Sequence, residues 1–132
     1  MDSGAVSPIE GIGGRRAIVA DGETFERIKI KQTRGPQIRF EGALLASQEW
    51  QARGRKLTIE VWETRAGALI GASYGEPTSE RGGIADVRAH VVEPSDDPLA
   101  MQFEIMDFFD WDNRARSMAQ RELGWKLVRE VD

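Results

Sequence analysis

The spacing of apolar residues changes once along this chain, and that change limits the fold more than any other feature. Up to Val92, apolar and polar residues alternate in short segments, which is typical of half-buried β-strands. After Ser95, apolar residues recur every three or four positions, which is typical of helices. A strand-rich part followed by a helical part predicts an α+β fold with a mainly antiparallel sheet.

The alternating part divides into five or six predicted strands. The clearest is Lys56–Thr64, where Leu57, Ile59 and Val61 alternate with Thr58, Glu60 and Trp62. The other strands predicted in this part are a hairpin of residues 24–32 with 37–46, strands at 68–74 and 84–92, and a short sixth segment at 16–20. A final short strand at 125–131 is predicted after the helical part. Residues 47–55 and 75–83 are polar and are predicted to be loops.

Two helices are predicted to follow and to pack on one face of the sheet. Asp97 and Pro98 suit an N-cap and a first helical position, and Asp112 offers a second cap for a helix over residues 114–123. Gly124 suits the left-handed position that ends such a helix. Residues 1–22 are rich in glycine and predict a flexible N-terminal arm, so that residues 23–132 would form a single domain.

Composition excludes several classes of function. The chain has no cysteine, which excludes disulfides, thiolate nucleophiles and cysteine-ligated metals. It has no apolar run of about 18 residues, and residues 1–10 lack the pattern of a secretory signal. We therefore expect a cytoplasmic protein.

The candidate catalytic and metal-binding residues have simpler structural explanations. The segment 11–16 lacks the glycines of a dinucleotide fingerprint and the ending of a P-loop, so we assign it to the arm. His90, the single histidine, lies opposite the row of small apolar residues in its strand and has no GxSxG motif to serve, which indicates a structural or exposed residue. Asp107, Asp110 and Asp112 could ligate a hard metal ion, but a solvated helix end and a cap explain them.

Four glutamates could supply paired carboxylates for acid–base chemistry. They are Glu60, Glu63, Glu76 and Glu80. The sequence predicts no geometry that pairs them, and the alternation places Glu60 on an exposed strand face. We therefore predict no catalytic residue, no metal site and no cofactor.

The predicted first hairpin is strongly basic. No acidic residue lies between Arg27 and Phe40. The basic residues in this stretch are Arg27, Lys29, Lys31, Arg34 and Arg39. One face of a two-stranded ribbon would carry them as a positive stripe, which could bind an acidic protein, bind nucleic acid, or guard an edge strand against aggregation.

Charge is also divided unequally between the two halves of the chain. Residues 1–56 carry a net charge of +3 and residues 57–132 a net charge of −7. Such a division can mark a surface for a partner, or the two halves can pair with each other on folding. We favour pairing between the halves, because a small domain must fold them together.

The segments RFEGALLA at 39–46 and LTIEVWETRAG at 57–67 resemble a pattern found in small uncharacterised bacterial proteins of plasmid or phage type. Those proteins share an RFxGxLLA strand, a TxIxxYxTxxG hairpin and a late helix, and Trp62 stands here where their pattern has tyrosine. The resemblance implies a bacterial accessory protein and assigns no catalytic residue. We therefore predict a non-enzymatic protein that acts through protein–protein contacts. The alternatives are a nucleic-acid-binding module that uses the basic hairpin and an enzyme with a carboxylate metal site.

Overall fold

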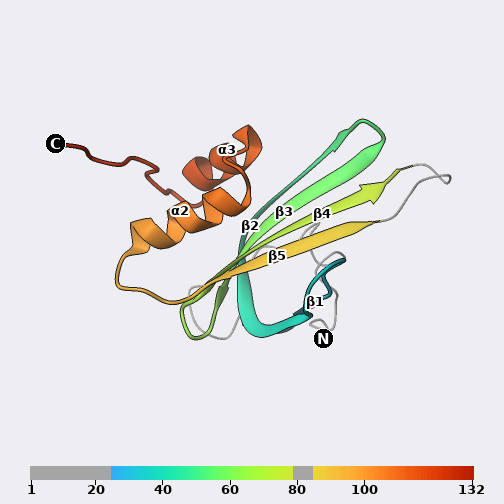
Figure 1. The fold of residues 1–132 in the computed structure, drawn as a ribbon, viewed down its shortest axis with the longest axis horizontal. Coiled ribbons are helices and arrows are strands. Elements are labelled where there is room, and N and C mark those ends of the chain that lie inside the picture. The colour runs from blue at the N-terminus through green and yellow to red at the C-terminus, as the bar shows by residue number, and fades with distance from the viewer. Residues whose placement is uncertain (1–24, 79–84) are drawn as a thin grey trace.

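The computed structural model describes residues 25–78 and 85–132. Within these ranges five strands form one antiparallel sheet in chain order: β1 (Glu26–Ile30), β2 (Ile38–Ala52), β3 (Arg55–Thr64), β4 (Leu69–Pro77) and β5 (Asp86–Val92). Helices α2 (Pro98–Phe108) and α3 (Asn113–Arg121) follow and pack against one face of the sheet (Figure 1). The predicted α+β fold is confirmed. The predicted arm at 1–22 and strand at 16–20 lie outside the described residues.

Strands β2 and β3 form a long hairpin with a two-residue turn. Arg53 and Gly54 have φ values of 54° and 75°, the left-handed conformation that such tight turns need. The predicted loop at 47–55 is therefore wrong, because β2 continues to Ala52. Its polar residues mark a strand whose tip is exposed to solvent, and polarity alone does not separate such a strand from a loop. Strand β4 likewise runs to Pro77, three residues into the second predicted loop.

A β-bulge in β2 bends the sheet. The pairing with β3 shifts between Leu44 and Ala46, which leaves Leu45 as the extra residue. Gly42 permits close packing nearby, because a Cβ atom there would lie 2.6 Å from the Phe40 ring. The sheet curls at this point, and the β1–β2 hairpin passes beneath β5 (Figure 1).

The curled sheet buries apolar side chains on both faces. On the convex face, Ile59 and Val61 pack against Ile105 of α2 and Met118 of α3. On the concave face, a separate cluster joins β1 to the central strands. Its buried members are Ile28, Ile30, Leu44, Trp62, Ile70, Ala72 and Tyr74.

Both helices begin at the predicted caps. The side chain of Asp97 accepts a hydrogen bond from the Ala100 amide at 3.1 Å, and that of Asp112 accepts one from the Arg114 amide at 2.8 Å. The break between the helices lies at Asp110 and Trp111, whose φ values are 57° and 52°.

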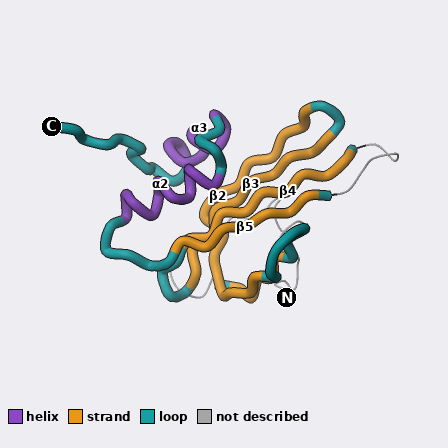
Figure 2. The backbone as a smooth tube through the Cα atoms, viewed as in Figure 1, coloured by secondary structure: helices purple, strands orange, loops and turns teal. Residues whose placement is uncertain are grey.

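The predicted strand at 125–131 is wrong. Residues after α3 form an irregular segment without a ladder to the sheet (Figure 2). Trp125 and Leu127 instead pack, half-buried, against the core on the helical side. A strand needs a neighbouring sheet edge for its backbone groups, and this segment leaves α3 on the side away from the sheet. No helix in the described residues is long and apolar enough to cross a membrane.

Candidate functional site

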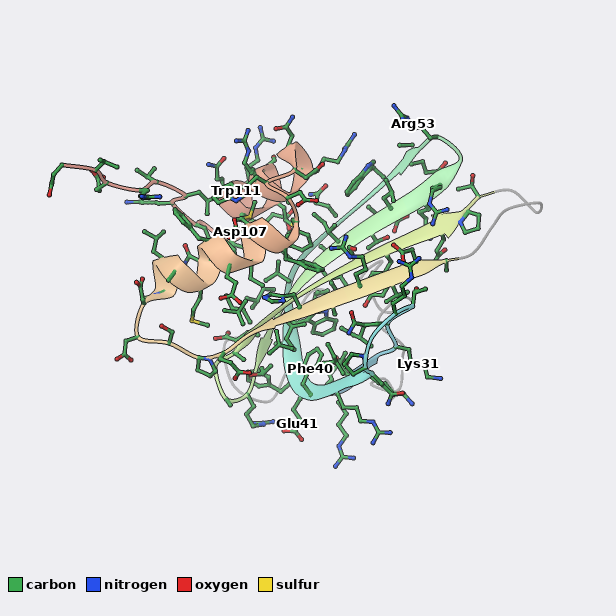
Figure 3. The ribbon with its side chains drawn as sticks, viewed as in Figure 1. Lys31, Phe40, Glu41, Arg53, Asp107 and Trp111 are labelled. Carbon is green, nitrogen blue, oxygen red and sulfur yellow. The ribbon has the colours of Figure 1, made fainter. Side chains whose placement is uncertain are left out.

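The five basic residues singled out in the sequence all lie exposed on or beside the outer side of the β1–β2 hairpin. We call them the basic face: Arg27, Lys29, Lys31, Arg34 and Arg39. Ile28 and Ile30 alternate with them and point into the concave core, as the sequence predicts. Figure 3 shows Lys31 projecting from the body at this end of the molecule, remote from Asp107 and Trp111 at the helical corner.

The register of the hairpin places like charges together. Lys29 lies directly opposite Arg39, an arrangement that destabilises a sheet when nothing neutralises it. Arg27 lies opposite Glu41, but the Glu41 carboxylate accepts a hydrogen bond from Arg65 Nε at 2.7 Å. Among the described residues, none of the five cations of the basic face forms an ion pair. The ion pair that joins the two halves of the described chain is Arg65–Glu41, so the favoured pairing of the halves does not neutralise the basic face.

Two further contacts shape this surface. With the Gln37 amide turned so that its oxygen faces Arg39, that oxygen accepts from Arg39 Nε at 2.8 Å, which orients the guanidinium. At the end of the hairpin near Glu41, the Arg65 guanidinium lies 4.9 Å from the centre of the Phe25 ring. The Phe25 ring is therefore already covered by a cation.

Glu60 corrects the sequence analysis. The alternation placed it on an exposed face, whereas the structure buries it completely at the centre of the concave core. The reason is the curl, which brings β1 over a face that an open sheet would leave to solvent. One sequence signal pointed this way, because Trp62 and Tyr74 share that face and large aromatic residues indicate burial.

The contacts of Glu60 are few. Its Oε1 atom accepts hydrogen bonds from Trp62 Nε1 at 2.8 Å and from the Tyr74 hydroxyl at 3.0 Å. Its Oε2 atom is buried and has no hydrogen-bond partner in the part of the chain that the structure describes. Burial raises the pKa of Glu60 to about 7, although the two hydrogen bonds act in the opposite direction. Burial, followed by the nearby Glu60 charge, also raises the pKa of Tyr74 above its ordinary value.

The structure does not gather the other glutamates around Glu60. Glu63 lies on the opposite face of β3, because neighbouring strand residues alternate in direction. Glu76 lies opposite Lys56 near the tip of the sheet, on the far side of Tyr74. Glu80 lies outside the described residues.

His90, Asp107 and Asp112 have structural partners, and Asp110 lies exposed at the break between the helices. His90 Nε2 lies 2.7 Å from Glu104 Oε2, and its ring stacks on Phe108 with centroids 5.9 Å apart, so it links β5 to α2. Asp107 accepts from Trp111 Nε1 at 2.7 Å, while Asp112 caps α3. In the described part of the chain, no three acidic or histidine side chains come together as a metal site.

A cleft of about 270 Å³ lies between the sheet and the corner where α2 meets α3. Its walls carry charges of both signs and four aromatic residues: Arg55, Arg88, Asp86, Asp110, Asp112, Trp50, Tyr74, Phe108 and Phe109. Arg55 donates to the Gly75 carbonyl at 2.9 Å, and the Arg88 guanidinium lies 5.1 Å from the Phe108 ring centre. Arg55 and Arg88 are thus engaged with a backbone carbonyl and an aromatic ring.

Comparison with known proteins gives no further guide to the site. No protein-family model, no curated protein and no solved structure matches the chain. The resemblance to plasmid and phage proteins stays a prediction, and function must be argued from the geometry.

Proposed function

We propose that this chain is a non-enzymatic binding protein that holds an acidic partner protein against its basic face. The observation that carries the proposal is the register of Lys29 opposite Arg39, with no described acidic group to neutralise either side chain. Such a pair costs stability in the isolated protein, and an anionic partner would remove that cost.

The distribution of acidic residues favours a protein over a nucleic acid as this partner. Residues 93–112 contain seven carboxylates and no basic residue, and they occupy α2 and its flanks. Their negative field would oppose a long polyanion such as DNA, but a compact acidic surface could contact the hairpin alone. Nucleic acid remains the second candidate, because the same cations would meet phosphates.

Fluorescence anisotropy with a short labelled polyglutamate peptide tests the proposal, since such a peptide presents carboxylates without a specific fold and can contact the hairpin alone. We expect binding that weakens with salt and that falls at least about tenfold in the double variant Lys29→Glu/Lys31→Glu. Both side chains are exposed, so thermal unfolding should show that the variant stays folded.

The matched control is Lys126→Glu/Arg129→Glu, which makes the same change in net charge at two exposed residues after α3. It should retain most of the affinity. Equal losses in both double variants would mean that net charge alone governs binding, and that result would refute a specific role for the basic face. Absence of binding to polyglutamate at low salt would refute it as well.

A further inference from the structure

The segment that follows strand β1 is joined to β5 by a few separate hydrogen bonds and not by a paired ladder. The Thr33 amide donates to the Val87 carbonyl at 2.9 Å, and the Val87 amide donates to Thr33 Oγ1 at 2.7 Å. Gln32 Oε1 accepts from the Ala89 amide at 3.0 Å. We call these contacts of Gln32 and Thr33 the clasp. They satisfy backbone groups that β5 would otherwise leave bare at the sheet edge.

The clasp closes the concave core over Glu60. Ile28 and Ile30 belong to the same buried cluster as Trp62 and Tyr74, the two donors to Glu60. Strand β1 therefore forms one wall of the space that excludes water from the carboxyl group. A few hydrogen bonds of Gln32 and Thr33 hold that wall to β5, whereas five residue pairs hold it to β2.

The neutral and the ionised form of Glu60 require different hydrogen bonding and solvation. A neutral carboxyl group costs less to bury in an apolar core than an ionised one. Because two donors contact Oε1, its proton lies on Oε2, where only an uncharged hydroxyl lacks a partner. An ionised carboxylate needs hydrogen bonds at both oxygens, yet Oε2 has none in the closed form. Burial raises the pKa of Glu60 to about 7, so the carboxyl group changes charge near neutral pH. Lifting β1 away would bring water to the ionised group and would break fewer contacts than unfolding the whole domain.

Other charged groups on the concave face lie away from Glu60. Tyr74 contacts Glu60 directly, and its raised pKa keeps it protonated near neutral pH. Glu49 and Lys56 pair with each other at 3.9 Å toward the tip, and Glu76 lies beyond Tyr74. Glu26 lies half-buried at the start of β1 and is engaged in its own contact. The part of β5 that faces the core carries only Val87, Ala89 and Val91.

We infer that the β1–β2 hairpin is a gate, held shut by the clasp, which opens when Glu60 loses its proton and so controls how the basic face is presented. The opening is a property of the free chain. Only its consequence for binding rests on the proposed function.

A single cysteine would report the opening, because the natural chain has none. Ala72 lies opposite Glu60 on β4 and is fully buried, so Ala72→Cys places a thiol inside the closed core. We expect the labelling rate, divided by that of a free thiol at the same pH, to rise about tenfold between pH 6 and pH 8 as Glu60 ionises. The rise should disappear in Ala72→Cys/Glu60→Gln and persist in Ala72→Cys/Glu63→Gln.

A second thiol separates local opening from unfolding of the whole chain. Ala119 is buried between α3 and the convex core, and Ala119→Cys should stay protected over the same pH range. A flat rate at position 72, or parallel labelling at both positions, would overturn the gate. If Ala72→Cys fails to fold, hydrogen exchange at the Val87 and Ala89 amides of the natural chain decides the same question. Their protection, corrected for intrinsic exchange, should fall above neutral pH.

The effect on binding is measured with the same polyglutamate probe. Affinity should fall more steeply from pH 6 to pH 8 in the natural chain than in Glu60→Gln, because an open hairpin no longer holds Lys29 and Arg39 in one orientation. Equal pH dependence in the two chains would refute control of the basic face. Because thiol labelling needs no partner, it can succeed when polyglutamate binding fails, and the two proposals are therefore tested separately.

Discussion

A carboxyl group inside a small apolar core is costly, and Glu60 leaves one oxygen without any partner. The free-energy cost of burying Glu60 depends on whether its carboxyl group is ionised. Because the folded-state pKa of about 7 lies above the ordinary 4.5, the folded chain binds this proton more tightly than the unfolded chain does. The resulting stabilisation is complete below about pH 4.5 and is lost as the pH rises through 7.

The first prediction follows from this linkage. Between pH 5 and pH 8, the contribution of Glu60 to the free energy of unfolding should fall by roughly 2–3 kcal/mol. Glutamine does not titrate, so the difference in unfolding free energy between the natural chain and Glu60→Gln should change by that amount. Urea unfolding at both pH values measures it, with Glu63→Gln as the control. Parallel pH profiles for the natural chain and Glu60→Gln would contradict it.

On the other face of the same strand, Ile59 is 6% exposed and packs beneath the helices. Ile59→Ala should lower the free energy of unfolding by about 2–5 kcal/mol, because it leaves a cavity in close-packed surroundings. Denaturant melts would test this, and a loss below about 0.5 kcal/mol would be incompatible with the observed register.

At the scale of elements, the acidic residues in the turn between α2 and α3 could be metal ligands or structural contacts, and their hydrogen bonds distinguish the two roles. Asp112 Oδ1 accepts hydrogen bonds from the amides of Arg114 and Ala115, at 2.8 and 3.3 Å. Asp107 holds the indole of Trp111 and thereby fixes the left-handed residues that separate the helices. Both aspartates are thus explained by backbone and side-chain geometry within the turn.

The third prediction is that Asp112→Ala costs about 1 kcal/mol of stability, the usual effect of losing an N-cap. Calorimetry with Mg²⁺, Ca²⁺ and Mn²⁺ should show no stoichiometric site of micromolar affinity in the natural chain. A site that appeared and was lost in Asp110→Asn would instead support the alternative of a carboxylate metal enzyme.

At the scale of the whole molecule, the fold separates charge. The basic face lies on the hairpin that curls beneath the sheet, while the carboxylates of residues 93–112 lie with α2 on the other side (Figure 1). The chain is acidic as a whole, with a net charge of −4. A short acidic surface can meet one side of such a molecule, whereas an extended polyanion also meets the other.

The fourth prediction is that duplex and single-stranded DNA bind no tighter than about 10 μM at physiological salt. Anisotropy over a salt series would measure this. Four phosphate contacts on duplex DNA would give a slope of about −3.6 in log affinity against log salt. Submicromolar binding with such a slope, abolished in the folded Lys29→Glu/Lys31→Glu variant, would put nucleic acid first.

The parts of this structure that sequence analysis predicted correctly depend on near neighbours in the chain. Alternation located the strands, the change of period located the helices, and Asp97, Pro98 and Asp112 marked where the helices begin. The exposure of Lys29 and Lys31 followed from the same alternation. Each of these signals acts within one or two turns of helix or one strand, so no knowledge of distant contacts was needed.

Only the tertiary structure determined which distant segments of the chain contact each other. Glu60 is buried because a bulge in β2 curls β1 over it, and the clasp of Gln32 and Thr33 joins segments more than fifty residues apart in the chain. Residues 125–131 have the composition of a strand but no sheet edge beside them, so they form none. Alternation tells which residues share a face of a strand, but whether that face meets solvent or another strand depends on the path of the whole chain.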